Sequence, residues 1–276
     1  MKHYLFAKFF NFMSEEELME KCLELGIDGP TLMIRDNFWV TPENFRKELP
    51  GFCKTAEKYH LEVKYADTGI RCDNLDNYTE LIKAMKDSGI EQFRIAYVSK
   101  KNFNGRLREI EDFARRNFEK VAEVAEKNDM QAVVQIHGGQ YPHNASTAYR
   151  CVRDLNPKYI GIKLDAGNNI NQEGYEYFSY QIPLLKEYIA AIGEKDACMM
   201  RGEDKGDGNK GWYRVFVPAC EGYTNYKEIF TELKNVDFKG PGILMPFYNV
   251  DNYALMEENL KKEIAYFKKL EKEAGL

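Results

Sequence analysis

Short apolar runs alternate with amphipathic stretches of helix length along the whole chain. The apolar runs predict strands at residues 3–10, 31–35, 63–68, 93–98, 132–136, 159–164, 197–200 and 243–247. The stretches between them, with apolar residues three and four positions apart, predict helices at 14–25, 41–59, 74–88, 107–128, 144–155, 175–191, 225–235 and 251–274. Two starts are marked in the sequence, by the capping box that Ser14 opens and by Pro42 after Thr41.

The segment 131–169 shows how these elements combine. It contains two apolar runs joined by a polar helix, so its strands are expected to lie parallel. Eight such strand–helix pairs within one domain length predict a single (β/α)8 TIM barrel over residues 1–276. A doubly wound open sheet is the rival, but the chain lacks the Gly-rich phosphate loop that usually accompanies it.

Composition narrows the class of protein. The net charge of −5 disfavours nucleic acid as a partner, and there is no apolar run long enough for a membrane span. Six scattered cysteines without a Cys-x-x-Cys pair indicate free thiols in a reducing compartment. We therefore expect a cytoplasmic protein with a small-molecule partner, for which a homo-oligomer is possible.

In a barrel the carboxyl ends of the strands build the active site. Alternation places Gln135 with His137, and Lys163 with Asp165, on the same side of their strands. The segment 202–222 is long for a connection and predicts either a lid or rim over the mouth or a surface loop. The polar residues expected at the mouth are Lys8, Arg35, Asp67, Arg71, Arg94, Gln135, His137, Lys163, Asp165, Asn168, Arg201, Glu203 and Glu221.

The order of several segments resembles the xylose isomerase-like TIM barrels, the sugar phosphate isomerase/epimerase group. These segments are LELGIDGPTLMI, RIAY, VVQIHGG, IGIKLDAGNN and ACEGYTNYKEIFTELKNVDFKGPGIL. The resemblance implies a divalent metal held by Glu, Asp, His and Glu on the fifth to eighth strands, with the two glutamates shuttling the proton. Carried over by position, these fall on Gln135, Asp165, the vicinity of Met199, and Met245, while Asn168 replaces a second His and His137 is retained.

This donor set departs from what the family needs. One carboxylate with an amide and two thioethers is a poor set for Mg²⁺ or Mn²⁺, and neither Gln135 nor Met245 can exchange a proton. No cofactor is therefore expected; a family metal (Mg, Mn or Zn) would require Gln135 and Asp165 to suffice. The few histidines disfavour a multi-metal nuclease as well.

Two functions remain open. The first is a sugar or sugar-phosphate isomerase/epimerase-like enzyme without the usual metal, with Asp165, His137 and Lys163 as catalytic residues. The second is a pseudoenzyme that binds a sugar or a partner but catalyses no reaction. In that case Asp165 and Lys163 belong to a structural ion-pair network, and the hydrogen bonds of His137 are made within the fold. The ligand-binding candidates are Gln135, Asn168, Arg201, Glu221, Trp212 and Tyr248.

Overall fold

The computed structural model describes residues 1–170 and 176–276. Its barrel strands are β1 (His3–Leu5), β2 (Gly29–Pro30), β3 (Leu32–Ile34), β4 (Tyr65–Thr68), β5 (Gln92–Arg94), β7 (Gln131–Gln135), β9 (Ile160–Asp165), β10 (Ile189–Glu194) and β13 (Gly242–Leu244). The helices are α1 (Glu15–Leu25), α2 (Phe45–Lys58), α3 (Thr79–Asp87), α4 (Leu107–Lys127), α5 (Ala145–Val152), α6 (Ala166–Asn169), α7 (Phe178–Leu185), α8 (Tyr226–Asn235) and α9 (Tyr253–Ala274).

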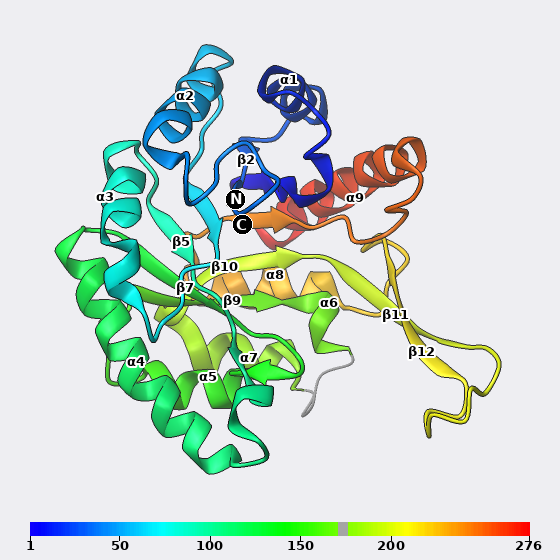
Figure 1. Ribbon diagram of the computed structural model, residues 1–276. Helices are drawn as coiled ribbons and strands as arrows, with labels where there is room; N and C mark the ends of the chain where they lie inside the picture. The colour runs from blue at the N-terminus through cyan, green and yellow to red at the C-terminus, as the bar shows by residue number, and fades with distance from the viewer. Residues whose placement is uncertain (171–175) are drawn as a thin grey trace.

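The strands form one parallel sheet that closes on itself (Figure 1). Its order is β2-β1-β13-β10-β9-β7-β5-β4-β3. The two end strands, β2 and β3, are separated only by Thr31, so together they occupy one barrel position between β1 and β4. The eight strand positions confirm the predicted TIM barrel, and β7 and β9 are parallel as the segment 131–169 predicted.

Helices cover the outside of this barrel, and the core lies between them and the strands (Figure 1). The strand residues of β1, β3, β4 and β9 are buried along their whole length, as expected where both faces of a parallel sheet are covered. The capping box expected at the first helix is present, with Ser14 accepting from the Glu17 backbone and Glu17 accepting from that of Ser14. Among the described residues, the helices are too short or too polar to cross a bilayer.

The seventh barrel strand is not where the sequence placed it. The helix expected over 175–191 ends at Leu185 in α7, and Ile189–Glu194 forms β10; Tyr175, its expected start, lies outside the described residues. The apolar Ile189–Ile192 run contains helix-forming alanines and follows a helix directly, so its pattern favoured a longer helix. Burial on both faces makes it a strand instead.

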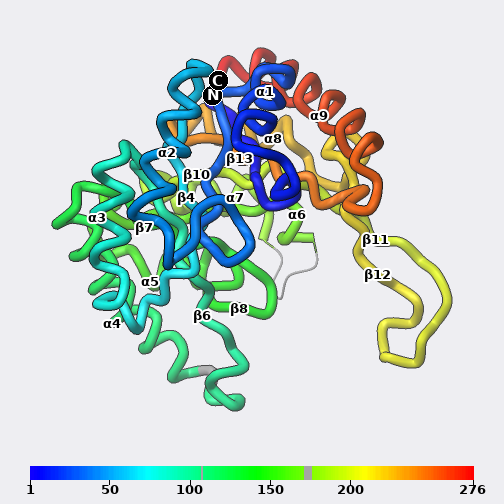
Figure 2. Tube along the Cα trace, turned by 45° about the horizontal axis from the view of Figure 1, so that its top comes forward, coloured from blue at the N-terminus to red at the C-terminus, as the bar shows by residue number. Residues whose placement is uncertain are grey.

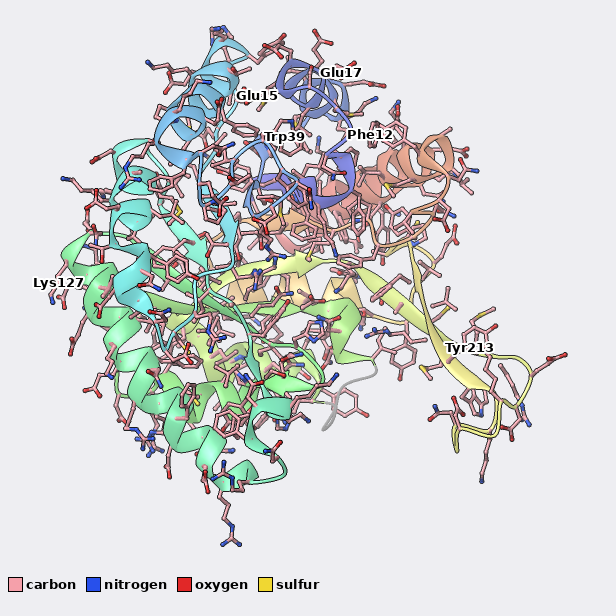
Figure 3. All side chains as sticks on the ribbon, viewed as in Figure 1. Phe12, Glu15, Glu17, Trp39, Lys127 and Tyr213 are labelled. Carbon is pink, nitrogen blue, oxygen red and sulfur yellow. The ribbon has the colours of Figure 1, made fainter. Side chains whose placement is uncertain are left out.

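The run at 197–200 belongs to an antiparallel hairpin, β11 (Asp196–Arg201) with β12 (Trp212–Val217). The hairpin projects from the body of the molecule in both views (Figures 1 and 2). Tyr213 marks its position in Figure 3, away from the barrel. A smaller ribbon, β6 (Val98–Ser99) with β8 (Gln140–Tyr141), joins the loops that follow β5 and β7.

Candidate functional site

A cavity of about 260 Å³ opens at the carboxyl ends of the barrel strands, and we call it the mouth cavity. Among the residues that the structure describes, five basic side chains line it against a single carboxylate, although the whole chain carries a net charge of −5. Its residues are Phe6, Lys8, Arg35, Asp67, Arg94, Tyr97, Gln135, His137, Asn168, Lys195, Arg214, Phe216, Met245 and Phe247. The sequence-predicted residues Gln135, His137 and Asn168 are therefore brought together.

Asp165 lies at the centre of a closed polar network beside this cavity. Its carboxylate accepts from Gln135 Nε2 at 2.6 Å, from Asn168 Nδ2 at 2.8 Å and from the Asn168 backbone at 3.1 Å. Lys195 Nζ lies 3.0 Å from the same carboxylate and donates to Asn168 Oδ1 at 3.0 Å. Four donors thus hold the two oxygens of one buried carboxylate.

Aromatic rings complete the environment of Lys195. Its Nζ lies 4.4 Å from the ring centre of Phe247 and 5.0 Å from that of Phe216. Burial lowers the pKa of Lys195, and Asp165 acts in the opposite direction. The side chain is 3% exposed, so the ammonium and Asp165 form a buried ion pair whose outer face is aromatic.

The corrected seventh strand changes which residue occupies the family's His position. In β10, Gly193 pairs in register with Asp165, whereas Met199 lies 40% exposed on the projecting hairpin. A Cβ at Gly193 would lie 3.1 Å from the sulfur of Met245 and 3.4 Å from Cε of Lys163. The inward position of this strand therefore has no side chain, and the next inward residue is Lys195.

These residues do not fit a divalent cation. The four strand-end positions hold an amide, a carboxylate, a glycine and a thioether, so they offer one anionic oxygen. That oxygen donor, Asp165, is already engaged by four hydrogen-bond donors, one of them an ammonium. Mg²⁺ and Mn²⁺ need several oxygen ligands, and the Lys195 charge opposes a second cation at the same place.

Lys163 lies below the mouth cavity, inside the barrel. It is completely buried, and its Nζ is 5.5 Å and 5.4 Å from the ring centres of Phe6 and Tyr65. Its Nζ has no hydrogen-bond partner among the described residues. Burial lowers the pKa of Lys163, with Asp67 and Asp165 acting in the opposite direction.

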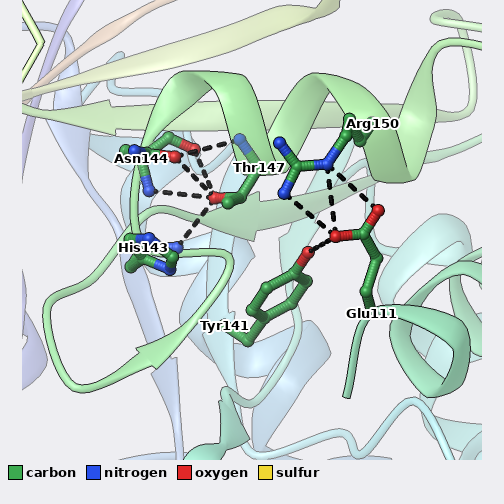
Figure 4. Close-up of polar contacts among 6 residues, drawn as sticks. All are labelled: Glu111, Tyr141, His143, Asn144, Thr147 and Arg150. Atoms are coloured by element: carbon green, nitrogen blue, oxygen red, sulfur yellow. Dashed lines mark hydrogen bonds and ion pairs between the residues drawn. The ribbon is translucent and has the colours of Figure 1, made fainter. Parts of the chain in front are cut away.

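His137 lies in the loop after β7, and neighbouring contacts hold that loop. Its Nδ1 is 2.6 Å from the Gly138 carbonyl oxygen, and its ring packs 4.8 Å from Tyr97. Figure 4 shows how the loop ends: Asn144 caps α5 through Thr147. In the same view Glu111 of α4 accepts from Arg150 at 2.9 Å and from Tyr141 at 2.8 Å, which anchors both sides of the loop.

Four expected ligand-binding residues lie away from the mouth cavity. Arg201 and Trp212 pair on the projecting hairpin, where the guanidinium lies 5.8 Å from the indole ring centre. Glu221 is exposed in the turn after β12. Tyr248 is buried and donates to Glu263 Oε2 at 2.9 Å, which is a structural contact with α9. Arg201 was placed at the mouth only because the hairpin was mistaken for a barrel strand.

The sequence interpretation missed two basic residues of the mouth cavity, Lys195 and Arg214. Lys195 follows β10 directly, so a correct seventh strand would have found it. Arg214 reaches the mouth from β12 and packs over Phe216 at 4.5 Å, which makes the base of the hairpin a rim of the cavity. That part of the segment 202–222 confirms the rim interpretation, whereas the tip extends outward (Figure 2).

A larger hollow, of about 750 Å³, lies at the opposite end of the barrel, but its charges are neutralised. Its five lysines, Lys2, Lys64, Lys86, Lys158 and Lys239, each have an acidic partner within 4.0 Å. Within residues 1–170 and 176–276, no such partner is found for Lys8, Arg35 or Arg214 at the mouth. The mouth cavity therefore differs from the larger hollow because, among the described residues, some of its basic side chains have no acidic partner. The active sites of TIM barrels also lie at the mouth end.

Comparison with known proteins agrees with this architecture. The family model described as "Xylose isomerase-like TIM barrel" matches residues 20–270. No curated protein sequence matches the chain.

Three solved structures illustrate the likeness in fold. A xylose isomerase domain protein from Planctomyces limnophilus is 13% identical with a TM-score of 0.70, covering 99% of this chain and 98% of that one. A xylose isomerase-like TIM barrel protein from Mycobacterium smegmatis, in complex with magnesium, is 15% identical with a TM-score of 0.67, covering 93% and 89%. The 3-keto-D-glucoside 4-epimerase from E. coli is 12% identical with a TM-score of 0.70, covering 98% and 99%.

Proposed function

The chain belongs to the xylose isomerase-like TIM barrel family, and on that premise we propose that it acts on an anionic sugar without a resident divalent metal. The ligand is a sugar phosphate or a sugar acid bound in the mouth cavity, and the reaction is an isomerisation or epimerisation. One observation carries the proposal: within residues 1–170 and 176–276, five basic side chains and one carboxylate surround a cavity of about 260 Å³. Phosphate and carboxylate groups are the ligands that such a cluster binds best.

Lys8 and Arg214 are the basic residues best placed to meet an entering anion. Lys8 is exposed and lies 5.4 Å from the ring centre of Phe247, the same ring that Lys195 covers. Arg214 is half-buried on the rim formed by the hairpin. Because neither side chain is paired with an acid among the described residues, both positive charges are available to attract a ligand carboxylate or phosphate.

Lys195 supplies positive charge where a sugar oxygen becomes negative during proton transfer. Its ammonium is held in place by Asp165 and Asn168 before any ligand enters, so little reorganisation is needed. In this arrangement Asp165, Gln135 and Asn168 position Lys195. The proton-transfer candidates are His137 at the cavity and Lys163 below it.

The magnesium named for the relative from Mycobacterium smegmatis belongs to that protein. In this chain the donor set around Asp165 supports a metal-free site, as argued above. The 4-epimerase among the solved structures supports sugar chemistry on this scaffold, at the level of a shared fold.

A second candidate function is binding of an anionic sugar without chemistry. The observation that favours it is the absence of an acidic side chain at Gln135 and at Met245, which removes the proton-shuttling pair that the family resemblance implies. Both candidates require the same ligand class and differ only in turnover.

Calorimetric titration of EDTA-treated protein tests the ligand class. Matched pairs, glucose 6-phosphate with glucose and glucuronate with glucose, differ only in charge at one end of the sugar. We expect the anionic member to bind at least tenfold more tightly, and Arg214→Gln to remove most of that difference. Lys239→Gln, at the opposite end of the barrel, is the matched control and should change nothing.

Equal affinity for charged and neutral sugars would overturn the proposal. So would binding that appears only after Mg²⁺ or Mn²⁺ is added. Turnover of a bound anionic sugar would then separate the enzyme from the binding protein.

A further inference from the structure

Two ionisable side chains, one on the wall of the mouth cavity and one beneath it, each have a polar atom without a hydrogen bond among the described residues. Asp67 lines the cavity and is 1% exposed; its Oδ1 accepts from Arg94 Nε at 2.8 Å, and its Oδ2 has no hydrogen-bond partner in the part of the chain that the structure describes. The Lys163 amine has none either, and no acid lies within 4.0 Å of it among residues 1–170 and 176–276. Both residues come from the inner face of the barrel, Asp67 from β4 and Lys163 from β9.

Buried polar atoms without hydrogen bonds lower the stability of a fold, so their presence requires an explanation. An unsatisfied buried polar atom costs about 1–3 kcal/mol, and more when the group is charged. By contrast, the neighbouring Asp165 is engaged by four donors within the same barrel. A free carboxylate oxygen on the cavity wall and a free amine in the barrel interior beneath it are suited to a ligand that is absent from the resting protein.

Burial also moves the pKa values of the two groups toward each other. Burial lowers the pKa of Lys163, which favours the neutral amine, a proton acceptor. Burial raises the pKa of Asp67, which favours the protonated carboxyl, a proton donor. A base and an acid whose pKa values move toward each other are the pair that sugar isomerisation needs.

Resting on the proposed function, we propose that Asp67 and Lys163 are the acid–base pair that moves a proton between adjacent carbons of the bound anionic sugar. They take the place of the family's two glutamates, whose positions hold Gln135 and Met245. The site of proton transfer is thereby moved from the fifth and eighth strands to the third and sixth.

The step balances within the sugar and the two side chains. The Lys163 amine takes the proton from the carbon next to the carbonyl, and the electron pair of that C–H bond forms the C=C bond of an enediol. The carbonyl oxygen takes the proton of the Asp67 carboxyl. Asp67 then removes the proton of the other enediol hydroxyl as that carbonyl forms, and Lys163 returns its proton to the carbon of the original carbonyl.

Deuterium exchange tests this step without knowledge of the full reaction. EDTA-treated protein is incubated in D2O with a panel of fructose 6-phosphate, glucose 6-phosphate, xylulose 5-phosphate and glucuronate, and mass spectrometry follows deuterium at carbon. We expect exchange with at least one of them. Asp67→Asn and Lys163→Met should each slow it by about 100-fold or more, the usual contribution of general acid–base catalysis.

Affinity separates this role from a structural one. Both variants should bind the same sugar within about threefold of the native protein, because neither group carries the charge that attracts the anion. Glu62→Gln and Lys2→Met, at the opposite end of the barrel, repeat the two chemical changes as controls and should exchange normally. If Asp67→Asn does not fold, Asp67→Glu retains a carboxyl group beside Arg94, displaces it by one methylene, and should slow exchange by tenfold or more.

The two proposals fail in different ways. Binding of an anionic sugar without any exchange, or exchange that both variants preserve, overturns the acid–base pair and leaves the anion site intact. Absence of binding by every anionic sugar of the panel overturns the proposed function and this inference with it.

Discussion

A buried ion-pair triad, formed by His3, Glu194 and Glu271, joins the first strand, the seventh strand and the last helix. His3 Nδ1 lies 2.9 Å from Glu194, and Nε2 lies 2.8 Å from Glu271. The same three side chains offer ligand atoms within 4.8 Å of one another, but each imidazole nitrogen already faces a carboxylate. A protonated His3 between two carboxylates is therefore the arrangement that the geometry supports. Gly242 makes room for it, since a Cβ there would lie 2.5 Å from the Glu194 carboxylate.

We predict that His3→Gln destabilises the protein strongly at neutral pH. Burial by itself would lower the pKa of His3, but Glu194 and Glu271 together raise it from 6.5 to about 10. The rise in pKa from 6.5 to about 10 corresponds to about 5 kcal/mol, close to the roughly 3–5 kcal/mol that removing one partner of a buried ion pair costs. Loss of about 3–5 kcal/mol is therefore expected.

The sign of the pH dependence follows from the raised pKa. A histidine with a higher pKa in the folded protein stabilises it fully below about pH 6.5, and this contribution is lost as the pH rises through about 10. The difference in free energy of unfolding between native protein and His3→Gln should accordingly shrink toward pH 10.5.

Urea unfolding at a series of pH values between 6 and 10.5 measures this difference. His60→Asn provides the control, because His60 is exposed and Asn tolerates its positive φ of 58°. A difference below about 1 kcal/mol at pH 7, or one that stays constant up to pH 10.5, would refute the charged triad.

Three further predictions concern other buried or exposed groups. Burial raises the pKa of Glu263 to about 8, so the folded protein loses stability as the pH rises through 8; Glu263→Gln should remove that loss, as seen in melting temperatures between pH 6 and 9. Asp165→Asn leaves the Lys195 ammonium unpaired and should cost about 3–5 kcal/mol, while adding Lys195→Met should recover part of it in a double-mutant cycle. Trp212→Ala should leave anion affinity unchanged and cost less than about 1 kcal/mol, because the indole is 47% exposed on the hairpin; a tenfold loss of affinity would place Trp212 in the site.

Most of the fold was predictable because the barrel repeats one local unit. Helix starts are marked by side-chain chemistry, as at Ser14, and the strands of a parallel barrel are short apolar runs. The prediction of the seventh strand was wrong for a related reason, because Ile189–Ile192 is a short apolar run that could also continue the preceding helix. The length and periodicity of such a run do not distinguish a strand from a continued helix. Burial on both faces does distinguish them, but burial depends on the tertiary structure.

The candidate site was predictable only as far as its strands were. Gln135, His137 and Asn168 follow correctly placed strands and meet at the mouth cavity. Arg201 follows the run that was wrongly predicted to be the seventh barrel strand, and it lies on the hairpin. Arg214 reaches the cavity because an antiparallel ribbon folds back over the mouth, a long-range contact that no local pattern announces.

The uncharged residues at Gln135 and Met245 and the ammonium of Lys195 are physically coupled. A buried carboxylate such as Asp165 must be neutralised, and here a single positive charge does so at 3.0 Å. Glutamates at positions 135 and 245 would add two negative charges that one ammonium cannot balance, whereas an amide and a thioether add none. The site is therefore close to neutral before the outer residues are counted. The positive charge of Lys8, Arg35 and Arg214 then remains uncompensated among the described residues, and an anionic ligand is what would balance it.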